Sequence, residues 1–338
     1  MEFNMIRSIR ETPKALDSAW KALEEWDIPQ KEFRRVIFIG CGSSYFSSIA
    51  GNHVLLKGSG VEGYALPASE FMLHYRKLAK RALVIASSRS GRTGEVVEAL
   101  RVARGEGATT IGVTCNENSK IELISDYTII LQNCEEPNIP ATKSFSAITY
   151  VLQGIAVRLL GDAQDKLKEL KTIKPAVEKI LAHEKDYRLI AERLIPKKAF
   201  VYIGSGAGYV VALEGALKFR ETLSLPNEVF PALEFRHGPI ALLKGPQKPQ
   251  PVIIVPDGNS ASAVKRLVRE IILGGVSPLI LTNSKLFQDC IKIPWEGSEK
   301  FAVIPFVVPL QILAYYLAIS NNLNPDNPNG LVKVVERF

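Results

Sequence analysis

The sequence repeats one plan of secondary structure, and this internal duplication limits the possible folds more than any other feature. Residues 34–56, RRVIFIGCGSSYFSSIAGNHVLL, read as a short β-branched strand, a glycine-serine turn and a helix. Residues 198–219, KAFVYIGSGAGYVVALEGALKF, repeat that order. The strand, turn and helix predicted for residues 82–104 have a counterpart at 250–272. The chain is therefore predicted to fold as two related halves.

Two further matches follow in the same order, residues 109–116 with 278–283 and residues 145–161 with 306–320. Strands that alternate with helices at these spacings predict parallel sheets covered by helices on both faces. The predicted fold class is α/β, with two doubly wound parallel sheets in tandem. Ligands of such folds bind beyond the carboxyl ends of the strands.

These matches predict a division of the chain into three parts. Residues 1–161 form the first half, and residues 199–338 form the second half together with a C-terminal tail. The lysine-rich and helix-prone stretch between them, residues 162–198, is predicted to be a helical linker.

The composition indicates a globular protein with a small acidic ligand. The chain has 338 residues, of which 46% are hydrophobic, and its formal charge is +7. Because the basic residues are scattered rather than gathered in a long run, nucleic acid is not expected as a partner. A phosphorylated small molecule fits this charge better.

The N-terminus has no apolar core of the kind found in signal peptides, and we expect a cytoplasmic protein. The four cysteines are widely spaced and form no Cys-x-x-Cys pair, so neither a zinc site nor a disulfide framework is predicted. Residues 301–320 are apolar and nearly long enough to cross a bilayer. Their match with residues 145–161 predicts a buried helix instead.

The turn at residues 87–93, SSRSGRT, is dense in hydrogen-bond donors. A turn between a strand and a helix offers free backbone N–H groups and the positive end of the helix dipole, which stabilise an anion. The residues that suit this role are Ser88, Ser90, Thr93, Gly91, Arg89 and Arg92. Hydroxyls also cap helices, but their density in this turn favours a phosphate site.

A second turn, CGSS at residues 41–44, is predicted to supply further donors nearby, although helix capping explains it equally well. The matching turn in the second half, PDGNSAS at residues 256–262, has Asp257 where an anion would be repelled. Only the first half is therefore expected to bind phosphate.

The chain resembles the double sugar-isomerase (SIS) domain family, whose subdomains have flavodoxin-like sheets, and within it the isomerase domain of glucosamine-6-phosphate synthases. The resemblance runs from about Met5 to Phe338. It is carried by six motifs: CGSS, SSRSGRT, ATKSF at 141–145, ALEGALKFRE at 212–221, EFRHGP at 234–239 and NPNGLVKVV at 327–335.

The resemblance implies roles for individual residues. It implies a substrate-binding set of Cys41, Gly42, Ser43, Ser44, Ser88, Arg89, Ser90, Thr93 and Glu214, in which Ser44, Ser88, Ser90 and Thr93 hold the phosphate of a hexose 6-phosphate. It implies that Glu221 moves a proton between C1 and C2, that His237 opens the sugar ring, that Lys333 reaches the substrate carbonyl and that Lys218 is a second active-site lysine.

The sequence departs from the synthases in three places. Arg92 stands where synthases commonly have glutamate, and Ala141 stands where they commonly have serine. The form EFRHGP is more similar to the stand-alone amino-sugar phosphate deaminases of the same family. No glutaminase half precedes the isomerase-like part, and we expect that this chain does not take ammonia from glutamine.

The spacing of Glu214, Lys218 and Glu221 places all three on one face of a predicted helix. Such spacing usually forms an exposed ladder of ion pairs, but the neighbouring sequence VVALEGAL is almost wholly apolar. Charges close to a core need a purpose. A partly desolvated carboxylate can move a proton next to a carbonyl, so Glu221 is the predicted base and Glu214 the predicted partner of Lys218.

His237 precedes Gly238 and Pro239, which fix a loop that can present a titratable ring to a ligand. Lys333 is flanked by apolar residues that are predicted to dock the tail, where its amine could attack a sugar carbonyl. No metal is predicted, because no histidines and carboxylates cluster at ligand spacing. No cofactor is predicted either, because neither glycine-rich turn matches a dinucleotide fingerprint.

The predicted function is a glucosamine-6-phosphate deaminase, which converts glucosamine 6-phosphate to fructose 6-phosphate and ammonia. The alternatives are ammonia-dependent synthesis of glucosamine 6-phosphate, another sugar-phosphate isomerase or deglycase, and a sugar-phosphate sensor without turnover. The expected partner is a hexosamine 6-phosphate or fructose 6-phosphate, with neither nucleic acid nor membrane. The resemblance further implies a homodimer, in which the histidine loop of one subunit can complete the site of the other.

Overall fold

The computed structural model describes residues 2–26, 33–56, 60–161 and 164–338. Its contacts divide the chain into two compact units. The N-terminal unit comprises Glu11–Lys171 with the tail Val332–Phe338, and the C-terminal unit comprises Met1–Arg10 with Thr172–Leu331. Each unit thus contains one sheet and one terminal segment from the other end of the chain.

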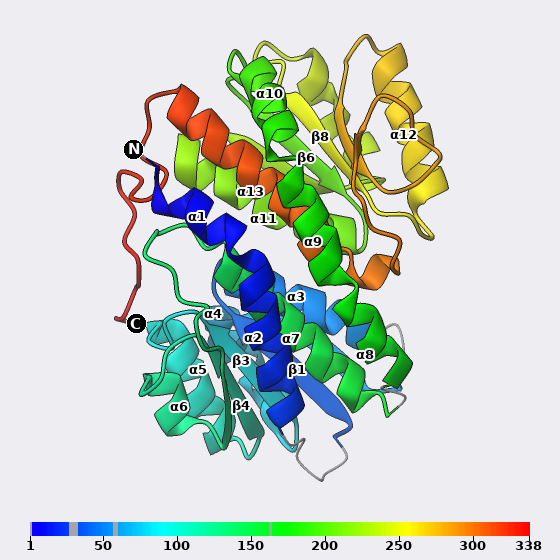
Figure 1. Cartoon of the computed structure of the whole chain (residues 1–338). Coiled ribbons are helices and arrows are strands. Elements are labelled where there is room, and N and C mark those ends of the chain that lie inside the picture. Colours follow the sequence, from blue (N-terminus) through cyan, green and yellow to red (C-terminus); the bar gives the residue numbers. More distant parts are fainter. Residues whose placement is uncertain (1, 27–32, 57–59, 162–163) are drawn as a thin grey trace. The chain divides into compact units, whose positions relative to one another are not determined.

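The N-terminal unit is built on a five-stranded parallel sheet of order β2-β1-β3-β4-β5 (Figure 1). Its strands are β1 (Arg35–Gly40), β2 (Glu62–Pro67), β3 (Leu83–Ser88), β4 (Thr109–Thr114) and β5 (Tyr127–Ile130). Its helices are α2 (Thr12–Glu25), α3 (Ser43–Leu56), α4 (Ala68–Glu70), η1 (Phe71–Tyr75), η2 (Arg76–Ala79), α5 (Gly94–Gly105), α6 (Lys120–Ile124), α7 (Lys143–Leu159) and α8 (Gln164–Lys171).

The C-terminal unit has a second parallel sheet, of order β10-β9-β8-β6-β7. Its strands are β6 (Phe200–Gly204), β7 (Asn227–Pro231), β8 (Gln250–Val255), β9 (Leu279–Thr282) and β10 (Ile291–Lys292). Its helices are α1 (Asn4–Arg10), α9 (Ile173–Ala182), α10 (Glu184–Leu194), α11 (Ala207–Leu223), η3 (Glu234–Arg236), η4 (Pro239–Lys244), α12 (Ala261–Leu273), η5 (Glu299–Phe301) and α13 (Val303–Ser320).

Both sheets have the same order when their strands are counted within each unit, namely second, first, third, fourth and fifth. The predicted matches are confirmed: β1 and α3 correspond to β6 and α11, β3 and α5 to β8 and α12, β4 to β9, and α7 to α13. The predicted α/β class with two doubly wound parallel sheets is also confirmed.

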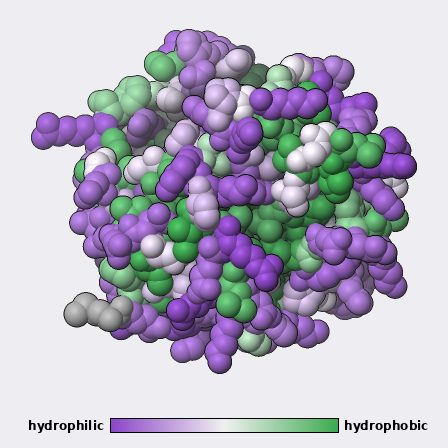
Figure 2. Space-filling model, turned by 90° about the horizontal axis from the view of Figure 1, so that it is seen from above, coloured by the Kyte–Doolittle hydropathy of each residue, from purple (hydrophilic) through white to green (hydrophobic). Residues whose placement is uncertain are grey.

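The central strands of both sheets are almost wholly buried because each sheet is covered on both faces. In β1, Ile37 and Ile39 belong to a core cluster with residues of α5. In β6, Val201 and Ile203 occupy the same places in a cluster with α12. On the opposite face of β6, the rings of Phe200 and Tyr202 pack against Phe219 of α11, with centroids 5.0 and 5.6 Å apart. Outside these cores, the surface in Figure 2 is mostly hydrophilic, with apolar side chains between polar ones.

Two glycines at equivalent places allow the first strand of each sheet to meet the helix that follows it. A Cβ at Gly40 would lie 2.6 Å from the backbone carbon of Ser44, and one at Gly204 would lie 2.2 Å from the backbone oxygen of Gly208. Both distances are too short for any side chain. The Ile-Gly pair of each half is thus a packing requirement.

Helix α13 is the apolar segment that raised the question of a membrane span. It is long and apolar enough to cross a bilayer, yet 83% of its residues are buried within the structure. It packs against α9, α10 and α11 of its own unit. The prediction of a buried helix is confirmed, and the core helix of a protein passes the same test of length and composition.

The segment predicted as a linker contains α8, α9 and α10, while residues 162 and 163 lie outside the described residues. The border between the two compact units falls inside this segment, between Lys171 and Thr172. The division into residues 1–161, 162–198 and 199–338 stays a prediction.

Candidate active site

The two serine-rich turns of the N-terminal unit follow neighbouring strands. Ile39 of β1 pairs with Ala86 of β3, so the turn after Gly40 and the turn after Ser88 leave the same edge of the sheet. In this strand order the chain runs from β1 to one side and from β3 to the other, which makes the edge a topological switch point. Ligands of doubly wound sheets bind at such a point.

The hydroxyls predicted to hold an anion come together after β3. Ser88 Oγ lies 2.9 Å from Thr93 Oγ1 and 3.5 Å from Ser90 Oγ. The backbone N–H groups of Gly91 and Arg92 donate to Ser88 Oγ and Ser90 Oγ, at 3.2 and 3.1 Å. Ser88 and Ser90 are buried, at 2% and 8% exposed. The turn is therefore preorganised by its own hydrogen bonds.

Gly91 is required by the geometry of this turn. Its φ of +63° lies in the left-handed region, which L side chains rarely adopt, and a Cβ there would be 2.4 Å from the side chain of Ser119. Helix α5 then begins at Gly94, at the end of the turn. The glycine thus lets the serine-rich backbone pack closely against the start of α6.

The CGSS turn lies beside this cluster, as predicted, because Ser87 Oγ donates to the carbonyl of Ser44 at 3.3 Å. Gly42 has a φ of +53° and is exposed, and Ser43 is the first residue of α3. Burial, and then the nearby carboxylate of Glu95, raises the pKa of the Cys41 thiol to about 11. Cys41 is therefore a neutral thiol at physiological pH rather than a nucleophilic thiolate.

The guanidinium of Arg89 contacts other segments of its own unit. Its Nη1 donates to the carbonyl of Asn138 at 3.2 Å, and its Nη2 donates to the carbonyl of Lys333 at 3.5 Å. Arg92 instead places its Nε 3.6 Å from Glu336 and leaves about half of its side chain exposed. The positive charge expected in the turn is thus shared with the chain itself.

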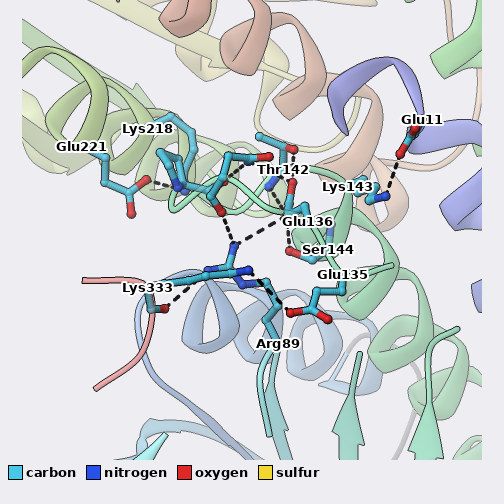
Figure 3. Close-up of polar contacts among 12 residues, drawn as sticks. Glu11, Arg89, Glu135, Glu136, Thr142, Lys143, Ser144, Lys218, Glu221 and Lys333 are labelled. Carbon is cyan, nitrogen blue, oxygen red and sulfur yellow. Dashed lines mark hydrogen bonds and ion pairs between the residues drawn. The ribbon is translucent and has the colours of Figure 1, made fainter. Parts of the chain in front are cut away.

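Glu136 is a buried carboxylate that sequence reasoning missed. Only 1% of it is exposed. Its oxygens accept from the backbone N–H groups of Thr142 and Ser144, at 2.7 and 3.2 Å, and from both hydroxyls of these residues (Figure 3). The Nη1 of Arg89 lies 3.9 Å away. The signal was the ATKSF motif, whose hydroxyls need an acceptor once they are buried.

The C-terminal tail contacts the N-terminal unit mainly through polar groups. The carbonyl of Val335 accepts from the backbone N–H of Gly94 at 3.0 Å, and Lys333 Nζ lies 3.5 Å from Glu135. Val332 and Val335 are 69% and 51% exposed, so the prediction that apolar bulk docks the tail is wrong for these two residues. The tail lies against the unit through its backbone carbonyls and its charges.

In the C-terminal unit, α11 brings together the three charged residues predicted on one face. Lys218 Nζ lies 3.2 Å from Glu214 Oε1. It lies 2.6 Å from Glu221 Oε2 (Figure 3). The side chains of Lys218 and Glu214 are fully buried, whereas that of Glu221 is 18% exposed. The cluster is a buried ion triad and not an exposed ladder, and only Glu221 is open to a ligand.

Burial alone would lower the pKa of Lys218. The carboxylates of Glu214 and then Glu221 offset that effect, and the pKa of Lys218 lies above its ordinary value of 10.5. Lys218 is therefore an ammonium in the folded protein. It can stabilise negative charge, but it cannot act as a neutral amine at physiological pH.

His237 lies apart from this cluster. It follows η3, it is exposed, and its backbone N–H donates to the carbonyl of Glu234 at 2.9 Å. Gly238 has a φ of +116°, which confirms that a glycine fixes the loop. Within the described residues no hydrogen bond or ion pair joins the His237 ring to α11.

The turn after β8 differs from the turn after β3, as predicted. The backbone N–H of Asp257 donates to Asn283 Oδ1 at 2.7 Å. A Cβ at Gly258 would lie 2.8 Å from a carboxylate oxygen of Glu299. Two acidic residues thus occupy the place where the N-terminal unit has hydroxyls, and an anion is disfavoured there.

The structure therefore brings the predicted residues together in two groups. The N-terminal unit gathers the serine-rich turns with Arg89 and Lys333, and the C-terminal unit gathers Glu214, Lys218 and Glu221. His237 joins neither group through a bond in the described residues. Across the described part of the chain, no three His, Cys, Asp or Glu side chains are grouped so that they could hold a metal.

Comparison with known proteins identifies the class. The SIS domain model matches residues 31–158 and 193–319, one copy in each half, so the chain belongs to the SIS domain family. Glutamine–fructose-6-phosphate aminotransferase (isomerizing) of Aquifex aeolicus is 31% identical over 98% of the chain, which covers 57% of that protein. The same enzyme of Sulfolobus acidocaldarius is 31% identical and is covered to 56%. The chain thus spans about half the length of these relatives.

Two solved structures have folds similar to that of this chain. The C-terminal domain of glucosamine-fructose-6-phosphate aminotransferase from Francisella tularensis matches with a TM-score of 0.87 at 22% identity, over 97% of this chain and 98% of that one. Glucosamine-6-phosphate deaminase from Thermotoga maritima matches with a TM-score of 0.74 at 28% identity, over 97% and 99% of the two chains. The chain is a double SIS protein related to the isomerase part of glucosamine-6-phosphate synthases.

Proposed function

We propose that this chain is a glucosamine-6-phosphate deaminase. The observation that carries the proposal is the ion triad on α11, in which buried Lys218 lies between Glu214 and the partly open Glu221. A buried charge cluster is costly for a fold and is retained where it performs chemistry. The hydroxyl-rich turn after β3 supplies a suitable anchor for the phosphate of the sugar.

In the proposed reaction, the serine-rich turns bind the phosphate and His237 assists the opening of the sugar ring. Glu221 takes the proton from C2 and returns it at C1, which leaves a C2 ketimine. Water adds to the ketimine carbon, and ammonia departs from it, so that fructose 6-phosphate remains. Lys218 stabilises the negative charge that develops on the substrate during the proton transfer.

Two observations on known proteins support deamination. The Thermotoga maritima deaminase is similar to this chain over nearly the full length of both proteins. The EFRHGP motif also has the form that the deaminases of this family carry.

The reverse reaction is the second candidate, because the aminotransferases are 31% identical over 98% of the chain. Fructose 6-phosphate and ammonia would then yield glucosamine 6-phosphate through the same proton transfer at Glu221. The concentrations of ammonia and of the two sugars decide the net direction. A sensor would bind the sugar phosphate without consuming it.

The decisive experiment incubates the protein with glucosamine 6-phosphate, without glutamine or added metal, and measures ammonia and fructose 6-phosphate. We expect equal amounts of both products. Glu221→Gln should reduce turnover by at least about 10²-fold, in line with the loss of a positioned general base, while the sugar phosphate still binds. Glu192→Gln is the matched control, because Glu192 is an exposed glutamate of α10 in the same unit.

Each result separates the candidates. Release of ammonia that depends on Glu221 supports the deaminase. Formation of glucosamine 6-phosphate from fructose 6-phosphate and ammonium, without measurable deamination, favours synthesis. Binding without conversion of any hexose or hexosamine 6-phosphate identifies a sensor and refutes the proposed enzyme.

We also propose that the active protein is a homodimer in which His237 serves the site of the other subunit. The exposed position of His237 supports this proposal. Two inactive variants, Glu221→Gln and His237→Ala, should regain activity when they are refolded together, because a mixed dimer then contains one intact set of residues. No recovery, with dimers seen by light scattering, contradicts shared sites.

A further inference from the structure

The C-terminal tail, Val332–Phe338, is placed with little help from apolar burial. Val332, Val335 and Phe338 are 69%, 51% and 67% exposed. The ion pairs of Lys333 with Glu135 and of Glu336 with Lys120 are long, at 3.5 Å each, and half exposed. Exposed pairs of this kind contribute only about 0–1 kcal/mol. The position of the tail therefore depends on hydrogen bonds to its backbone.

Two such hydrogen bonds to the backbone of the tail are present among the residues that the structure describes. The backbone N–H of Gly94 donates to the carbonyl of Val335 at 3.0 Å, and Arg89 Nη2 donates to the carbonyl of Lys333 at 3.5 Å. Only the second comes from a charged side chain, and it reaches the residue whose amine is predicted to meet the sugar. A hydrogen bond from a charged donor is the stronger kind.

Arg89 is itself held from the other side. Its side chain is 12% exposed, and its Nη1 donates to the carbonyl of Asn138 at 3.2 Å. The Asn138 side chain in turn donates to Pro140 at 2.7 Å and to Glu136 Oε2 at 3.2 Å. The buried carboxylate of Glu136 is thus the origin of a chain of contacts that runs through Asn138 and Arg89 to the tail. Figure 3 shows Arg89 between Glu136 and Lys333.

The chemistry of this chain of contacts requires an arginine. Guanidinium is planar and has donors that point in fixed, different directions, so one side chain can serve Asn138 and Lys333 together. A glutamine has donors on a single nitrogen, and a lysine has no fixed fork. Glu136 lies 3.9 Å from the same guanidinium and opposes its charge within the unit.

We infer that Glu136 and Arg89 are positioning residues for Lys333. They act through the backbone carbonyl of Lys333, and the amine at the other end of its side chain is left to react. The part of the inference that concerns the sugar rests on the proposed function. There, the amine of Lys333 attacks the keto carbon of fructose 6-phosphate, and the resulting carbinolamine loses water to give an imine.

The first experiment needs no sugar. Trypsin cleaves after Lys333 only when the tail is released, and intact mass spectrometry measures the rate of that cleavage. We expect Arg89→Gln to raise the rate at least about tenfold, which corresponds to about 1.4 kcal/mol, since a hydrogen bond from a charged donor is lost. Arg101→Gln on α5 is the control and should leave the rate unchanged, because the side chain of Arg101 is 58% exposed and pairs with Glu98.

Arg89→Lys keeps the charge without the fork, and it replaces Arg89→Gln if that variant fails to fold. It should release the tail as well, because one ammonium cannot hold both carbonyls. Glu136→Gln should release the tail in the same way if the carboxylate orients Arg89. Unchanged cleavage in all three variants overturns the inference, and unchanged cleavage in Glu136→Gln alone removes Glu136 from it.

The second experiment adds fructose 6-phosphate and borohydride, which reduces an imine to a stable adduct on Lys333. At saturating sugar, Arg89→Gln should trap adduct about tenfold more slowly. A weaker Kd for inorganic phosphate with unchanged trapping shows that Arg89 only binds phosphate and overturns the inference. If the native protein traps no sugar and releases no ammonia, the proposed function fails, and the tryptic cleavage still decides the positioning role.

Discussion

The turn after β3 and the turn after β8 occupy the same place in two copies of one fold, yet they have opposite chemistry. The first gathers the hydroxyls of Ser88, Ser90 and Thr93, and the second places Asp257 and Glu299 at the corresponding point. The hydroxyls are therefore not a requirement of the strand-turn-helix unit. The comparison distinguishes residues that the fold requires in both copies from residues that are present in only one copy.

Helices α3 and α11 extend this comparison into the core. If the Ile-Gly pairs at Gly40 and Gly204 are aligned, Glu214 corresponds to Ala50, and Lys218 corresponds to Val54. All four residues are buried, at 0–1% exposed. Because α3 fills these positions with alanine and valine, the fold does not need charges there. Their presence in α11 is what the proposed reaction requires of this copy alone.

The largest effect is expected for a variant that tests whether the fold requires the buried charges of α11. Lys218→Met should destabilise the protein by about 3–5 kcal/mol, because it leaves the carboxylates of Glu214 and Glu221 without their buried cation. The double variant Glu214→Ala with Lys218→Val copies α3 and should recover most of that stability, yet it should lack activity. Urea denaturation measures both free energies of unfolding.

The contribution of Lys218 to the stability of the protein should depend on pH, and the direction of that dependence can be checked. Its pKa is raised on folding, so its contribution to stability is complete below its ordinary pKa of 10.5 and is lost as the pH rises beyond that value. The difference in stability between the native protein and Lys218→Met should therefore be constant from pH 7 to 10 and shrink above pH 10.

The double variant Glu214→Ala with Lys218→Val provides the control. If it is as unstable as Lys218→Met, the fold of α11 does need its charges, and the comparison between α3 and α11 is wrong.

The sequence predicted the repeated core of the fold and missed its edges. The strands β1, β3, β4, β6, β8 and β9 are almost wholly buried, which a sheet covered on both faces requires. The edge strands β2, β5, β7 and β10 were not predicted. Most of their residues are only partly buried, and side chains such as those of Tyr127 and Glu228 remain exposed, so no apolar pattern marks them.

The candidate site was likewise predicted only in part. Spacing alone placed Glu214, Lys218 and Glu221 on one face, because i, i+4 and i+7 positions are fixed by the helix. Spacing could not find the contacts of Glu136 with Arg89, because they join loops that are far apart in sequence. The apolar residues around Lys333 predicted a docked tail for the wrong reason, since hydrogen bonds to its carbonyls hold it.

A smaller effect is expected for the hydroxyls that only the first turn has. Ser88→Ala removes the hydroxyl that accepts from the Gly91 N–H, although the Ser88 carbonyl still accepts from it, and it removes the contact with Thr93. The Kd for a hexose 6-phosphate should rise about tenfold, which corresponds to the net value of a hydrogen bond of about 1.4 kcal/mol, while the proton transfer at Glu221 is retained. Calorimetric titration gives the Kd, and initial rates at saturating sugar give kcat.

Ser260→Ala is the matched control, because Ser260 precedes α12 in the second turn and its side chain makes no capping hydrogen bond. This variant should leave the Kd unchanged. Equal losses of affinity in the two variants would show that both turns bind phosphate and would end the distinction between the copies.

The smallest effect concerns Cys41, whose counterpart after β6 is Ser205. Burial and Glu95 raise the pKa of the Cys41 thiol to about 11, so the thiol stays neutral between pH 6 and 9 and gains charge only as the pH approaches that value. Cys41→Ser gives the turn after β1 the residue that the turn after β6 has. Because a neutral thiol supplies no nucleophile, the variant should change kcat less than about threefold, within the tolerance of a near-isosteric change of about 1 kcal/mol.

Alkylation by iodoacetamide measures the thiolate of Cys41 directly. Its rate at pH 8 should be far below that of a free thiol and should rise with each increase in pH up to about 11. Fast labelling at pH 8, or loss of turnover in Cys41→Ser, would show that the first turn contributes a nucleophile as well as an anion site. The two copies would then share the chemistry, and the assignment of proton transfer to α11 alone would have to be given up.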